Sequence, residues 1–119
     1  MFHSRSRFAT LVVAGLLVGG SPAFAQIPAD LLARAESGDA VAQFSLGVMY
    51  ATGEGVPENT ERAYMWFSVA AAGQSGEDRD DAVAARDRAS ARLTPEQRSR
   101  AQALATTCFN STFTDCGEP

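Results

Sequence analysis

Cys108 and Cys116 are the residues of this sequence whose chemistry is easiest to define. They lie eight positions apart, whereas a redox-active pair of the thioredoxin type has the spacing Cys-x-x-Cys. In an oxidising compartment an even number of cysteines usually forms disulfides. We therefore expect a structural disulfide between Cys108 and Cys116, with a redox pair and an intermolecular bridge as the alternatives.

Groups for acid–base or nucleophilic catalysis are scarce. The chain of 119 residues contains no lysine, and its one histidine, His3, lies near the N-terminus. A serine nucleophile is usually activated by a neighbouring histidine or lysine that acts as a base. The sequence offers no such partner for Ser45, Ser68, Ser75 and Ser90. Nothing marks a carboxylate pair of the glycosidase kind, and Gly53-x-Gly55 is too short for a phosphate-binding fingerprint. We expect no catalytic residue and no enzyme activity.

The acidic residues Asp78, Asp80 and Asp81 are the best candidates for a cation site. A calcium loop alternates its oxygen ligands, has a central glycine and closes with a bidentate glutamate. Ala82 and Val83 interrupt that pattern. The acids are better explained as favourable charges at a helix N-terminus, so we expect neither a metal nor a cofactor.

The N-terminal segment has the three parts of a cleavable signal peptide. Residues 1–7 carry Arg5 and Arg7 without an acid, residues 8–18 carry no charge, and residues 23–25 read Ala-Phe-Ala. The uncharged run is too short for a spanning helix, which needs about 20 apolar residues. We expect residues 1–25 to be a signal peptide, the product to be periplasmic or secreted, and no stable membrane insertion after cleavage.

The charge of the remaining chain limits its partners. Residues 26–119 contain eight arginines and fourteen acids, a net charge of −6. A strongly acidic chain is repelled by the phosphates of nucleic acids and of anionic membranes. We therefore expect no nucleic-acid partner.

Helical periodicity runs through most of this remainder. Apolar spacing, caps and glycine or proline breaks predict five helices, at about residues 28–37, 40–52, 60–72, 80–92 and 95–107. No segment alternates long enough to predict a sheet. The predicted fold class is all-α, with a helical domain over residues 26–107 and a disulfide-tied tail over residues 108–119.

The second and third predicted helices carry a recognisable pattern. It reads Ala35-x-x-Gly38-Asp39-Ala40-x-Ala42-Gln43-x-x-Leu46-Gly47-x-Met49-Tyr50, then Gly53-x-Gly55-Val56-Pro57, then Ala63-x-x-Trp66-Phe67-x-x-Ala70-Ala71-x-Gly73. This pattern resembles the Sel1-like repeat, a helical hairpin of the tetratricopeptide type, over residues 35–73. The chain is identified as an exported bacterial member with a single clear repeat and flanking helices. Small or aromatic residues would form the repeat core, namely Gly47, Ala63, Trp66 and Ala70.

The resemblance also bears on activity. Some cysteine-rich members of this family are linked to β-lactam hydrolysis or binding, and they carry a cysteine pair in each repeat. Residues 35–73 contain no cysteine, so a β-lactam-related or other hydrolase is only a third hypothesis.

The helix over residues 60–72 is apolar on nearly every side, which is typical of a buried helix or of an interface. If it is buried, Trp66 and Ala63 are core, and Phe67 and Ala70 pack on the helix over residues 80–92. If part of it is exposed, Tyr64 and Phe67, with Tyr50, could anchor a partner, because aromatic residues are enriched at binding hot spots.

Such repeats present a groove to proteins or peptides. We therefore expect a protein-interaction module or small adaptor of the cell envelope. The alternative is a self-associating structural protein of the envelope that pairs through this helix as a homo-oligomer.

Overall fold

The computed structural model describes residues 27–117, and the expected signal peptide over residues 1–25 lies outside that range. Five helices follow one another, α1 (Ala29–Glu36), α2 (Ala40–Thr52), α3 (Thr60–Ala72), α4 (Gly76–Ala91) and α5 (Pro95–Asn110). No strand occurs among the described residues. The predicted all-α class is confirmed.

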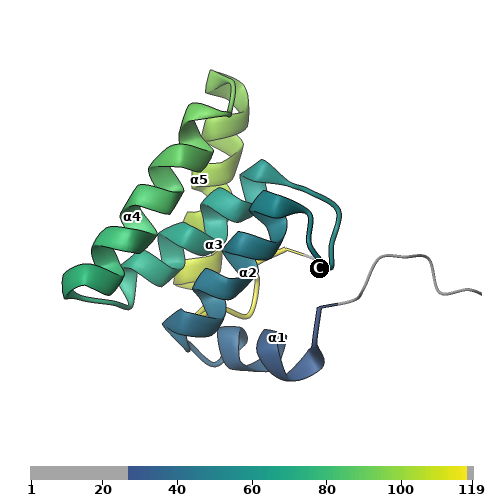
Figure 1. The fold of residues 1–119 in the computed structure, drawn as a ribbon, viewed down its shortest axis with the longest axis vertical. Helices are drawn as coiled ribbons and strands as arrows, with labels where there is room; N and C mark the ends of the chain where they lie inside the picture. The colour runs from purple at the N-terminus through teal and green to yellow at the C-terminus, as the bar shows by residue number, and fades with distance from the viewer. Residues whose placement is uncertain (1–26, 118–119) are drawn as a thin grey trace, which may run out of the picture.

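Helix α3 lies at the centre of the arrangement and packs against α2, α4 and α5, while α1 packs on α2 (Figure 1). Helix α5 runs parallel to α3. Near the two N-termini, Arg100 Nη2 lies 2.8 Å from Glu61 Oε1, and near the two C-termini Phe109 lies beside Val69. An apolar helix surrounded by three others explains why the sequence of α3 lacks a polar face.

The α2–α3 hairpin is closed by a glycine. A Cβ atom at Gly47 would lie 2.5 Å from the ring of Phe67, so only glycine lets the two helices approach this closely. The Phe67 ring also packs on Phe44 of α2, with 5.3 Å between ring centroids. Phe67 thus packs on α2, a contact that the sequence analysis did not predict, and it shares its core cluster with Ala85 and Ala89 of α4.

Helix starts follow the capping residues of the sequence. The Asp39 carboxylate accepts hydrogen bonds from the Val41 and Ala42 amides at the start of α2. At the start of α5, Thr94 and Gln97 exchange the two hydrogen bonds of a capping box. Both predicted starts are confirmed.

Helix α4 begins earlier than predicted. It starts at Gly76 rather than near Asp80, so the four acids among residues 77–81 lie inside its first turns. Negative charges at a helix N-terminus interact favourably with the macrodipole. The sequence analysis used this effect but placed the helix start at the end of the acidic run instead of its beginning.

Helix α5 ends later than predicted. It continues to Asn110, so Cys108 is buried in its last turns and is not the first residue of a tail. Cys108 and Cys116 form a disulfide with their Cα atoms 4.3 Å apart. The disulfide closes a short loop after α5, which we call the C-terminal loop (residues 111–116).

Candidate functional site

Two of the three aromatic residues predicted to bind a partner lie in the core. The exposed fraction is 4% for Tyr50 and 3% for Phe67. Phe67 fills the space above Gly47, and the Arg62 guanidinium covers the Tyr50 ring, 5.6 Å from its centroid. Neither ring is available to a partner, so a core role replaces the expected role of these two residues as anchors.

The residues predicted to form the repeat core are buried. Ala63, Trp66 and Ala70 of α3 lie inside the molecule. Ala70 forms a small cluster with Ala71 and with Ala82 of α4. Small side chains on both helices allow α4 to pack closely on α3.

The least buried row of α3 runs through Tyr64, Ser68 and Ala72, at four-residue spacing. Tyr64 is half-buried and packs on the edge of the core. One turn later, the Ser68 hydroxyl donates a 2.7 Å hydrogen bond to the Tyr64 carbonyl oxygen. Ser68 and Ala72 of this row border two adjacent hollows, one between α3 and α5 and one between α3 and α4.

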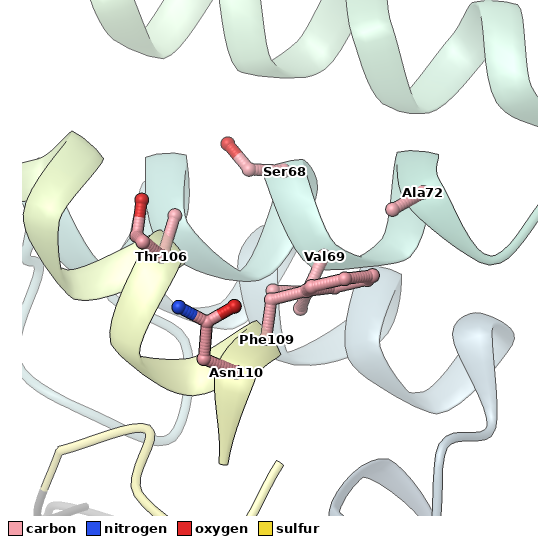
Figure 2. Close-up of a pocket in the computed structure, with 7 residues that line it drawn as sticks. Ser68, Val69, Ala72, Thr106, Phe109 and Asn110 are labelled. Atoms are coloured by element: carbon pink, nitrogen blue, oxygen red, sulfur yellow. The ribbon is translucent and has the colours of Figure 1, made fainter. Parts of the chain in front are cut away.

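We call these two hollows together the α4–α5 groove. Its apolar end has a volume of about 300 Å³ and is lined by α3 and α5, through Ser68, Val69, Ala72, Ala105, Thr106, Phe109 and Asn110. Figure 2 shows the Phe109 ring extending from α5 along α3, below Val69 and Ala72. A partner side chain can therefore contact the ring and the small residues of α3 together.

The other end of the groove is polar. It has a volume of about 380 Å³ and is lined by α3 and α4, through Ser68, Ala71, Ala72, Gln74, Arg79, Val83 and Arg86. Ser68 and Ala72 border both ends. In Figure 2 the Ser68 hydroxyl points from α3 toward α4. The groove thus crosses α3 from an aromatic wall on α5 to an arginine-bearing wall on α4.

Phe109 is held in place although 53% of it is exposed. Its ring meets that of Phe113 edge to face, with the centroids 6.2 Å apart. Phe113 lies in the C-terminal loop, and its amide donates a 2.9 Å hydrogen bond to the Cys108 carbonyl oxygen. The disulfide therefore supports the aromatic wall of the groove through Phe113.

Sequence reasoning missed Phe109 because it placed the residue in a tail without periodicity. With α5 extended to Asn110, Phe109 follows Ala105 by four positions and Thr106 by three. Residues at these spacings lie on one helix face. The helical spacing of Phe109 was therefore visible in the sequence, but Thr107 and Cys108 are weak helix formers and did not favour extending the helix.

The groups with displaced pKa values lie at helix ends away from the groove. The pKa of Asp39 is lowered, first by the hydrogen bond from the Ala42 amide and then by Arg34. The hydrogen bond with Glu61 raises the pKa of Arg100. Within residues 27–117 no three potential ligands gather as a metal site would require. Over the same range, no helix has the length and apolar content needed to cross a membrane.

Comparison with known families identifies the hairpin whose geometry is described above. The family model of the Sel1 repeat matches residues 40–75, which is α2, α3 and the turn that follows. Residues 40–75 are thus assigned to a Sel1 repeat. Comparisons with curated proteins and with solved structures found no match.

The residues matched by the Sel1 repeat model form the α2–α3 hairpin, and the groove lies where α4 and α5 pack on α3. Sel1 repeats are helical modules that are typically non-catalytic and suggest protein binding. The match is therefore consistent with a protein-interaction role.

Proposed function

We propose that this protein is an exported interaction module or small adaptor that holds a segment of a partner protein in the α4–α5 groove, without catalysis. The observation that carries the proposal is the exposed ring of Phe109 beside the small residues of α3. Pre-positioned aromatic rings in hollows are typical anchors of protein interfaces.

The proposal of export rests on the sequence of residues 1–25 and on the disulfide between Cys108 and Cys116. Disulfides persist in the periplasm and outside the cell. We expect the chain purified from its host to begin at Gln26. N-terminal sequencing of the processed protein tests this, and an unprocessed N-terminus beginning at Met1 would contradict it.

Site-specific photo-crosslinking in the native host tests the groove. A photoreactive phenylalanine analogue at Thr106, in the groove, should capture one dominant protein. The same analogue at Glu54 serves as the control, because Glu54 is exposed in the turn between α2 and α3, outside the groove lining. Equal capture from both positions would contradict the proposal.

A variant that fills the groove provides the second part of the test. Ala72→Arg places a long side chain on the groove floor and should abolish the crosslink from Thr106. Ala103→Arg is the matched control, because Ala103 is an exposed alanine of α5 outside the groove lining. Capture that survives Ala72→Arg would show that the partner binds elsewhere.

Self-association is the second candidate, and one observation favours it. Val41 and Val48 on the outer face of α2 are 62% and 37% exposed. Most of the α3 helix is buried, so pairing through α3, as the sequence suggested, is replaced by pairing through α2. Sedimentation equilibrium of the chain and of Val41→Glu tests this, with a dimer that Val41→Glu dissociates as the supporting result.

A further inference from the structure

The wall that α4 contributes to the groove carries positive charge only. Arg79, Val83 and Arg86 recur at four and three positions, so they share one face of α4. Among the described residues that line the groove, none is an aspartate or a glutamate. This is unexpected in a chain whose acids outnumber its arginines by fourteen to ten.

Two acids of α4 line a different hollow. Asp78 and Asp81 line it on the α2 side of the helix, together with Val41 and Phe44. The two sides of the N-terminal half of α4 therefore differ in charge. The side toward α2 is acidic, and the side toward the groove is basic.

The guanidinium groups are available to a ligand. Arg79 is exposed and forms no ion pair within the described part of the chain. Arg86 donates two hydrogen bonds to Asp87 Oδ1, from Nε at 3.1 Å and from Nη2 at 2.9 Å, and the Asp87 side chain is largely exposed. Such exposed pairs contribute little free energy, so a carboxylate from a partner can compete with Asp87. Two guanidinium groups on one face are suited to bind a carboxylate with paired hydrogen bonds.

We infer that the segment bound in the α4–α5 groove is an acidic peptide with a large apolar side chain. Its carboxylate contacts Arg79 and Arg86, and its apolar side chain packs on Phe109 and the α3 floor. The two ends of the groove meet at Ser68 and Ala72, so both groups can come from one short segment. This inference rests on the proposed function and adds the chemistry of the partner.

Selection from a random heptapeptide display library on the immobilised full chain, with its disulfide intact, tests the inference. We expect enrichment of sequences that combine aspartate or glutamate with an aromatic or long aliphatic residue. Enrichment of basic sequences, or of apolar sequences without acids, would overturn the carboxylate contact.

Charge-reversal variants assign the contact to the groove. Arg79→Glu should weaken binding of a selected fluorescein-labelled peptide about tenfold or more, because it opposes a carboxylate with a carboxylate. Arg88→Glu is the matched control. It makes the same charge change at another exposed position of α4 outside the groove lining, and it should change the affinity by less than about twofold. Equal losses in both variants would indicate only the overall charge and would overturn the inference.

Failure of this inference and failure of the proposed function give different results. If Ala72→Arg blocks peptide binding but Arg79→Glu does not, the groove is a binding site without a carboxylate preference. If Ala72→Arg leaves binding of the selected peptide unchanged, the groove is not the site and both proposals fail. Circular dichroism of each variant verifies that the helices are intact.

Discussion

The two helical pairs α2–α3 and α4–α5 are packed differently. In the first pair, Gly47 brings the helices close enough for the Phe67 ring to fill the interface. In the second pair, contacts concentrate at the connecting turn, where Leu93 is buried and Arg98 Nη2 donates a 3.0 Å hydrogen bond to the Ser90 carbonyl oxygen. The helices then diverge along α3 (Figure 1). The tightly packed α2–α3 pair stabilises the fold, whereas the divergence of α4 and α5 leaves the α4–α5 groove open on α3.

Replacing one phenylalanine by alanine in each pair should give the largest difference in stability between the two pairs. Phe67→Ala leaves a cavity in the closed hairpin and should lower the free energy of unfolding by about 3–5 kcal/mol. Phe109→Ala removes a half-exposed ring and should lower it by about 1 kcal/mol or less. Urea denaturation followed by circular dichroism measures both. Similar losses would contradict the distinction between a closed and an open pair.

Removal of the disulfide next to α5 should have the next largest effect on stability. Replacing Cys108 and Cys116 by serine together removes the constraint of a short loop, which is worth about 2–3 kcal/mol. Without it the C-terminal loop no longer holds Phe113 against Phe109. We expect lower stability together with weaker binding in the groove. Unchanged denaturation midpoints for the oxidised chain and the double variant would contradict this expectation.

Gly47→Ala tests the packing of the α2–α3 hairpin by adding a single methyl group. The Cβ atom would meet the Phe67 ring, and overpacking of this kind costs about 1–3 kcal/mol. This cost opposes the gain of about 1 kcal/mol in helix propensity. Combining Gly47→Ala with Phe67→Leu makes room for the methyl group, so the combined loss should be smaller than the sum of the single losses. Additive losses in the double-mutant cycle would show that the added methyl group does not clash with the Phe67 ring.

The fold was predictable at positions where the residue type has a single structural role, such as capping a helix or allowing close packing. Thr94 with Gln97 marks the start of α5, and Asp39 marks the start of α2. The Gly47 contact was also predictable, because a glycine inside an apolar helix indicates close packing. Boundaries failed where two elements fit the residues equally well, as in the acidic run at the start of α4 and the polar end of α5.

The candidate site was less predictable than the fold. Burial depends on which helices lie next to α3, and periodicity alone does not say that three of them do. Tyr50 and Phe67 therefore looked like surface anchors but lie in the core, while Phe109 was not considered. The charge of the groove depends on which face of α4 turns toward α3, and the sequence does not specify this.

The smallest predicted effect is a pH dependence at the start of the closed hairpin. The pKa of Asp39 is lowered in the folded protein by the Ala42 amide and by Arg34. Its contribution to stability is therefore complete above the ordinary aspartate pKa of about 3.9 and is lost as the pH falls through the lowered value. Thermal unfolding between about pH 5 and pH 3 should show a smaller decrease in midpoint for Asp39→Asn than for the native sequence. Parallel decreases would exclude this contribution.

The central position of α3 has a consequence for cooperativity. In a long array each repeat contacts only its neighbours, so unfolding can begin at one end and spread. Here α2, α4 and α5 all contact the same helix, so none of them keeps its apolar surface covered once α3 is lost. We expect these helices to melt in a single transition, with the amides of α3 exchanging their hydrogens most slowly and only by global unfolding.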